Sequence, residues 1–89
     1  MKACKIDITG RVQGVFFRAH ACTKAKELSL TGTVKNMPDG SVQIIAQGDE
    51  EKLIQLVHWC HVGPLLAVVD EVRVEDMEMV NYTTFLTIK

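Results

Sequence analysis

Apolar and polar residues alternate along five short segments of the chain, which is the pattern of strands that bury one face. In the first segment Cys4, Ile6 and Ile8 alternate with polar residues, and successive side chains of a strand point to opposite faces. The same period predicts further strands over residues 30–37, 42–46, 69–79 and 82–88. The pattern therefore predicts a sheet of short strands.

Two of these strands are separated by a turn signal at residues 37–41, Met-Pro-Asp-Gly-Ser. Pro38 fixes its own φ and Gly40 accepts a positive φ, so the chain can reverse direction there. Residues 30–37 and 42–46 are therefore predicted to form a hairpin.

The last strand, residues 82–88, has two possible phases. Either Phe85 and Thr87 face the core, or Leu86 and Ile88 do. A shift of one residue exchanges the two faces of a strand, and the pattern alone leaves both phases open.

Two other segments repeat apolar residues at helical spacing. The first helix has an apolar face made by Phe17, Ala21, Ala25 and Leu28. The second helix follows Gly48 and opens with acidic residues, which suit the positive end of a helix. Its buried face is made by Leu53, Leu56, Val57 and Cys60. Gly63 and Pro64 are expected to end this helix.

The order of elements is strand, helix, two strands, helix, two strands. This order predicts an α+β fold, a split β-α-β sandwich in which both helices cover one face of an antiparallel sheet. We see no repeat, linker or low-complexity segment, so residues 1–89 are expected to form a single domain.

Composition limits the classes of protein that the chain can represent. A net charge of -1 argues against a general binder of nucleic acids or membrane surfaces. No apolar run approaches the ~18 residues that span a membrane, and the alternating N-terminal residues are unlike a signal peptide. Three widely spaced cysteines indicate reduced thiols. We therefore expect a cytoplasmic monomer with neither a nucleic-acid nor a membrane partner.

The loop between the first strand and the first helix carries the candidate chemistry, residues 10–18, GRVQGVFFR. Gly10 and Gly14 free the backbone to turn and to expose consecutive N–H groups. The helix that follows begins with unpaired N–H groups and a partial positive charge. Arg18 adds a planar, permanently charged fork. Together these features predict a cradle for an anion, best suited to a phosphoryl group.

The same residues resemble the first signature of the acylphosphatase family: glycine, a basic residue, Val-Gln-Gly-Val, any residue, Phe-Arg. A second stretch, residues 32–36 (GTVKN) followed by Gly40, Val42 and Gly48, resembles the family's second signature in order and spacing. Two separated motifs are more specific than a lone glycine-rich loop. The resemblance covers nearly the whole chain and implies the family's ferredoxin-like fold.

The resemblance also implies an activity, the hydrolysis of the mixed anhydride between a carboxylate and phosphate. The family uses no metal or cofactor and forms no covalent phosphoenzyme. Arg18 would hold the phosphate of a small acyl phosphate, Asn36 would orient the attacking water, and inorganic phosphate would be a product. The implied phosphate-binding loop consists of Gln13, Gly14, Val15, Phe16, Phe17 and Arg18.

Three threonines depart from the family's pattern. Thr33 stands where an aromatic residue is usual, Thr84 where a glycine is common, and Thr87 where an apolar residue is usual. We expect Thr33 to reduce packing beside Asn36 without removing the chemistry. Thr84 and Thr87 are expected to affect rigidity and stability near the C-terminus.

Other candidate residues have simpler structural interpretations. His58 and His61 lie three apart on the second helix, as two metal ligands would, but histidines also suit the negative end of a helix and Cys60 falls on its apolar face. No metal site is therefore assigned. Phe17 and Trp59 are expected to pack in or near the core, whereas Phe16 can lean over the anion cradle.

Alternative functions remain open at this point. The main one is a non-catalytic anion-binding or regulatory module of the same fold. An RNA-binding domain would need clustered aromatic residues and a basic balance. A metal carrier would need closely spaced cysteines. A domain of a larger carbamoyl-transferring enzyme would share the same order of elements, although that order at 89 residues favours a free-standing protein.

Overall fold

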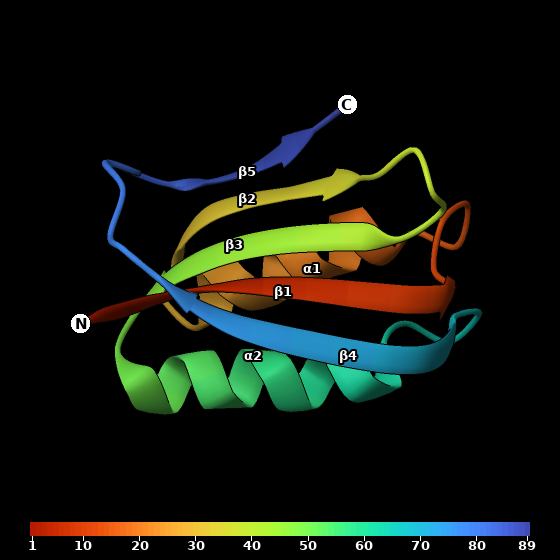
Figure 1. The fold of residues 1–89 in the computed structure, drawn as a ribbon, viewed down its shortest axis with the longest axis horizontal. Coiled ribbons are helices and arrows are strands. Elements are labelled where there is room, and N and C mark those ends of the chain that lie inside the picture. The colour runs from red at the N-terminus through yellow and green to blue at the C-terminus, as the bar shows by residue number, and fades with distance from the viewer.

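A computed structural model describes all 89 residues, and the elements follow the predicted order (Figure 1). The elements are β1 (Lys2–Arg11), α1 (Phe17–Glu27), β2 (Thr31–Asn36), β3 (Val42–Gly48), α2 (Glu50–Val62), β4 (Val68–Met77) and β5 (Phe85–Ile88). One sheet forms the first layer, and both helices cover one of its faces as the second layer. Neither helix is long and apolar enough to cross a bilayer. The predicted α+β fold is confirmed.

The sheet has the strand order β4-β1-β3-β2-β5. β1 is antiparallel to both β3 and β4, and β2 is antiparallel to β3, as the hairpin prediction requires. β5 runs parallel to β2, so the prediction of an antiparallel sheet is wrong for this pair. The chain leaves β4 at the end of the sheet where β2 begins and crosses to the opposite edge there (Figure 1). The next strand must therefore run in the same direction as β2.

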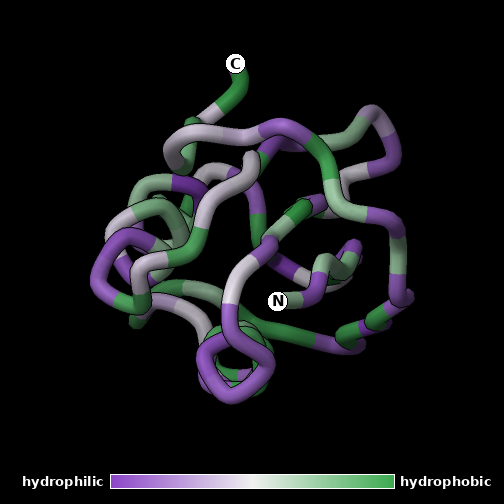
Figure 2. The backbone as a smooth tube through the Cα atoms, turned by 90° about the vertical axis from the view of Figure 1, so that its left-hand side faces the viewer, coloured by the Kyte–Doolittle hydropathy of each residue, from purple (hydrophilic) through white to green (hydrophobic).

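The core lies between the sheet and the helices, where the apolar faces predicted from the sequence meet. Its largest fully buried side chains include Phe17, Phe85, Ile6, Ile8, Ile44 and Leu56. The first turn of α2, which faces the viewer at the bottom of Figure 2, is hydrophilic. In β5, Phe85 is 1 % exposed and Leu86 is 55 % exposed. The phase in which Phe85 and Thr87 face the helices is therefore the observed one.

β1 continues to Arg11 and does not stop at Thr9, where the alternation ends. Gly10 has a φ of 126°, and a side-chain carbon there would collide with the carbonyl oxygen of Val68. The pairing with β4 shifts register between Thr9 and Gly10, which is the mark of a β-bulge. Gly10 thus permits the close approach of β4, and our assignment of this glycine to the anion cradle is replaced by a structural role.

Candidate active site

The first turn of α1 has no capping side chain. Phe16, the residue before the helix, adopts a left-handed conformation with φ 66° and ψ 20°, and its side chain makes no cap hydrogen bond. His20 N–H donates to the Phe16 carbonyl at 3.1 Å, which closes the first helical turn. The first turn contains no acidic residue. The N–H groups ahead of His20 therefore remain available to an outside acceptor.

Arg18 lies in this first turn, and its side chain is held by a hydrogen bond to the edge strand β5. Its Nη1 donates to the carbonyl oxygen of Ile88 at 2.9 Å, across 70 residues of sequence. One nitrogen of the guanidinium is thereby anchored to β5, while the other donors of the fork stay free. A cation at a helix N-terminus is electrostatically unfavourable unless an anion joins it.

Asn36 is the last residue of β2 and carries an unusual polar atom. Its Oδ1 is buried and has no hydrogen-bond partner in the structure. Buried polar atoms are almost always paired, so an orphaned acceptor indicates a missing donor such as water.

The turn beyond Asn36 is tied to the loop that precedes α1. The Gln13 Nε2 donates to the carbonyl oxygens of Met37 at 2.8 Å and Ser41 at 2.9 Å. Within the turn, the Ser41 hydroxyl and backbone N–H donate to the Asp39 carboxylate at 2.6 and 2.9 Å. These bonds from Ser41 hold the pKa of Asp39 below its usual range. The two segments that carry Arg18 and Asn36 are therefore fixed to each other.

A hollow of about 370 Å³ lies between these segments. It is lined by Val12, Gly14, Phe16, Phe17, Arg18, Ala19, Asn36, Thr87 and Lys89. Among the residues expected at the site, Gln13 and Val15 do not line it, because Gln13 bonds to the turn and Val15 is buried. The sequence analysis did not assign Val12, Ala19, Thr87 or Lys89 to the site. The sequence pattern left the phase of β5 open, so it carried no signal that could have placed Thr87 there.

The aromatic residues lie as expected. Phe16 is 70 % exposed and lines the hollow. Phe17 is buried, and its ring centroid lies 5.2 Å from that of the half-buried Trp59. Phe17 thus packs the start of α1 against α2, whereas Phe16 borders the space above the cradle.

The side chains of His58, Cys60 and His61 do not face a common site. Both histidines are exposed, whereas Cys60 is fully buried. Burial raises the pKa of the Cys60 thiol to about 12. Cys60 is therefore a neutral core residue on the apolar face of α2.

Thr33 does not lie beside Asn36. It pairs with Ile45 and Leu86 on the sheet face that points away from the helices, because side chains alternate and the adjacent Val34 is buried under them. The expected loss of packing next to Asn36 is therefore wrong.

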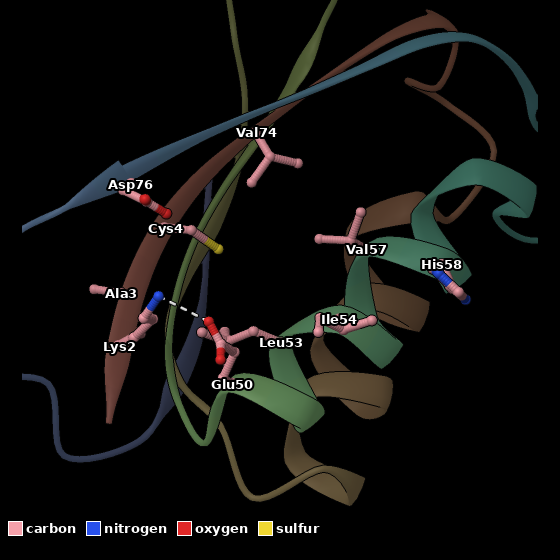
Figure 3. Close-up of a pocket in the computed structure, with 10 residues that line it drawn as sticks. All are labelled: Lys2, Ala3, Cys4, Glu50, Leu53, Ile54, Val57, His58, Val74 and Asp76. Carbon is pink, nitrogen blue, oxygen red and sulfur yellow. Dashed lines mark ion pairs between the residues drawn. The ribbon is translucent and has the colours of Figure 1, made fainter.

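A second hollow of about 270 Å³ lies between α2 and β4 (Figure 3). Leu53, Ile54, Val57 and Val74 form its apolar walls. Lys2 lies at one end, where its Nζ is 2.7 Å from the Glu50 Oε2. The cation beside this hollow is already neutralised, so the hollow lacks the features that would hold a phosphoryl group.

The fold and the first hollow define an α+β protein in which an uncapped helix start, Arg18 and Asn36 border one cavity. A family model described as acylphosphatase matches residues 4–87. The chain is 48 % identical over 81 residues to an acylphosphatase of Marinobacter nauticus, covering 90 % of this chain and 88 % of that protein. It is 44 % identical over 90 residues to an acylphosphatase of Methylococcus capsulatus, covering 100 % and 98 %. The crystal structure of acylphosphatase from Bacillus subtilis matches with a TM-score of 0.96 and 32 % identity over the full length of both chains.

The chain belongs to the acylphosphatase family and is a hydrolase. The resemblance carried by residues 10–18 and 32–36 is thereby confirmed.

Proposed function

We propose that this protein hydrolyses acyl phosphates to a carboxylate and inorganic phosphate in the hollow beneath the first turn of α1. The supporting observation is that the uncapped start of α1, Arg18 and Asn36, whose buried Oδ1 has no partner, border one hollow. An anion site alone would suffice for binding, whereas a buried acceptor beside it suits a reaction with water.

In this proposal the loop from Gln13 to Arg18 holds the phosphoryl group. Backbone N–H groups and the Arg18 fork donate to its oxygens and stabilise the charge that is spread over them in the transition state. Gln13 and Val15 contribute through the backbone, because their side chains point elsewhere. The donors need little rearrangement during the reaction, since Arg18 is anchored to Ile88.

Asn36 positions the attacking water. Its neutral amide cannot remove a proton, but Oδ1 accepts a hydrogen from water and so aims an oxygen lone pair at phosphorus. The new O–P bond forms as the bond between phosphorus and the carboxylate oxygen breaks, and the water proton passes to a phosphoryl oxygen. The leaving carboxylate needs no protonation, so no metal, cofactor or side-chain base is required.

The proposal extends to the protein as a whole. Residues 1–89 act as a single catalytic domain and as a monomer whose only partners are the small substrate and its products. A cytoplasmic location is consistent with three free cysteines. A net charge of -1 does not favour a nucleic-acid partner.

The experiment is steady-state hydrolysis of acetyl phosphate by the wild type and by Asn36→Ala. Loss of the water-positioning amide should lower kcat by about 10²–10³-fold, as for other preorganised groups, with the fold intact by circular dichroism. Asn81→Ala, an exposed asparagine outside the hollow, is the matched control and should keep wild-type turnover.

Four results would count against the proposal. Unchanged turnover in folded Asn36→Ala would remove the role of this residue. Wild-type turnover no higher than that of Arg18→Ala would instead favour a non-catalytic anion-binding module. A loss of activity with chelator, or a steep pH dependence near pH 6–7 where histidine titrates, would contradict the metal-free, base-free route.

A further inference from the structure

Thr87 lies on the side of β5 that faces the active-site hollow. It follows Phe85 by two residues, and Phe85 is buried beneath the helices, so both side chains are on the same face. It pairs with Val34 of β2, which precedes Asn36 by two residues on that face. Thr87 also lines the same hollow as Arg18 and Asn36. The family-atypical threonine is therefore part of the wall of the site.

The hydroxyl of Thr87 is not used within the protein. It takes part in none of the side-chain hydrogen bonds of the structure. Thr23 offers a contrast, since its hydroxyl on α1 donates to the carbonyl oxygen of Ala19 at 3.1 Å. Thr87 is also exposed, so packing does not explain a polar group at this position.

The spacing between Thr87 and Asn36 suits one bridging water. Adjacent strands lie about 4.8 Å apart and residues rise about 3.3 Å each, so diagonal neighbours two residues apart are about 8 Å apart at the backbone. Two short side chains at that separation cannot bond directly, but a water molecule can reach both. Asn36 Oδ1 has no hydrogen-bond donor within the protein, so its acceptor capacity is unused.

We propose that Thr87 is a second water-positioning residue, whose hydroxyl donates a hydrogen bond to the attacking water while Asn36 Oδ1 accepts one hydrogen of that water. One lone pair of the water oxygen is then left to face phosphorus, and its second hydrogen is left to pass to a phosphoryl oxygen. This inference rests on the proposed hydrolysis. It does not alter the route of the proton, which moves to a phosphoryl oxygen as the new bond is completed in a loose transition state.

The test uses Thr87→Val, which keeps the shape and removes the hydroxyl, and Thr87→Ser, which restores the hydroxyl. With acetyl phosphate, Thr87→Val should lower kcat about five- to tenfold, the equivalent of one ordinary hydrogen bond, with KM and the melting temperature unchanged. Thr87→Ser should return kcat to near the wild-type value. Thr83→Val, outside the hollow in the segment before β5, is the matched control and should behave as the wild type.

A double-mutant cycle with Asn36→Ala separates positioning of a shared water from a general effect on the site. If both residues hold the same water, Thr87→Val should cost little further activity once Asn36 is removed. Full additivity would overturn the inference. So would wild-type kcat in Thr87→Val, a kcat in Thr87→Ser as low as in Thr87→Val, or a raised KM with unchanged kcat. Each leaves the proposed function intact if the wild type is active, whereas an inactive wild type overturns both.

Discussion

The two helices begin at opposite ends of the same sheet, and their first turns are built in opposite ways (Figure 1). α2 follows Asp49 and carries Glu50 and Glu51 in its first turn, whereas α1 has no acidic residue there. Acidic side chains supply the negative charge that a helix N-terminus favours. The chain therefore supplies negative charge at the start of α2 and none at the start of α1.

The two hollows also differ in whether a neighbouring charge is neutralised within the protein. Each borders a helix and a cation, but Lys2 is paired with Glu50 beside the α2–β4 hollow, whereas Arg18 has only a carbonyl partner beside the other. The volumes, about 270 and 370 Å³, do not separate them. What distinguishes the candidate active site is the set of donors and acceptors that the protein leaves unpaired.

The largest effect is expected when the fork of Arg18 is replaced by a point charge. Arg18→Lys should lower kcat/KM for acetyl phosphate by about 10²–10³-fold, because an ammonium cannot donate to a phosphoryl oxygen and to Ile88 in the same planar geometry. Arg73→Lys, exposed on β4, is the control and should retain activity. Equal activity in Arg18→Lys and the wild type would show that charge alone suffices.

A second prediction makes the start of α1 resemble that of α2. Ala19→Glu puts a carboxylate in the first turn of α1, at the wall of the hollow. We expect kcat/KM to fall about 10–100-fold because the new charge repels the substrate and competes for the free N–H groups. The same charge should stabilise the fold by about 0.3–1 kcal/mol.

Ala19→Gln is the matched control for that change, since it has the same shape without the charge. It should retain most of the activity, as judged by steady-state kinetics, and urea unfolding should show little stabilisation. An equal loss of activity in both variants would indicate that bulk, and not charge, blocks the hollow.

A smaller effect is expected at Gln13, which links the two halves of the site. Gln13→Ala removes both bonds to the turn and should destabilise the protein by about 1–3 kcal/mol. It should also lower kcat about tenfold, because a modest displacement of the turn moves Asn36. Gln43→Ala removes a side-chain bond to Asp7 outside the hollow, and kinetics should show no loss. Wild-type kcat in Gln13→Ala would mean that Asn36 is held without this link.

The local parts of the fold could be predicted from the sequence, because the period of a strand or helix is set by neighbouring residues. The alternation at Cys4, Ile6 and Ile8 and the turn at Gly40 needed no distant information. The direction of β5 and its phase could not be predicted in this way. An alternating pattern reads the same for either direction, and both faces of residues 85–88 carry an apolar residue.

For the candidate site too, the residues within local motifs could be predicted, whereas the contacts that hold them in place could not. The resemblance in residues 10–18 and 32–36 supplied Arg18 and Asn36. The bonds that hold them join residues 24 to 70 positions apart, such as Gln13 with Met37 and Arg18 with Ile88. Such contacts depend on how the elements pack, so no local pattern could have shown them.

The smallest effect is expected from a substitution at the start of α2, where the protein supplies its own acidic residues. Such a substitution should change stability without changing activity. Glu50→Gln removes the ion pair with Lys2. In this pair the side chain of Lys2 is 57 % exposed and that of Glu50 is 61 % exposed. Exposed pairs contribute little, so urea unfolding at pH 7 should show a small loss of stability, and acetyl phosphate hydrolysis should be unchanged. Glu51→Gln removes a charge from the same turn without breaking the ion pair. Comparison of the two variants therefore separates the contribution of the ion pair from that of the helix dipole.

The pH dependence of that loss identifies its cause. The bond and charge of Lys2 hold the pKa of Glu50 below its usual value of 4.5, so this contribution is present above 4.5 and is lost as the pH falls through the folded pKa. Glu50 raises the pKa of Lys2 above its usual value of 10.5, so the contribution is present below 10.5 and is lost as the pH rises through the folded pKa of Lys2. The difference between the wild type and Glu50→Gln should therefore persist from about pH 5 to 10 and vanish in acid. A difference that persists at pH 2 would have to come from packing, and the contrast between the two helix starts would no longer be one of charge.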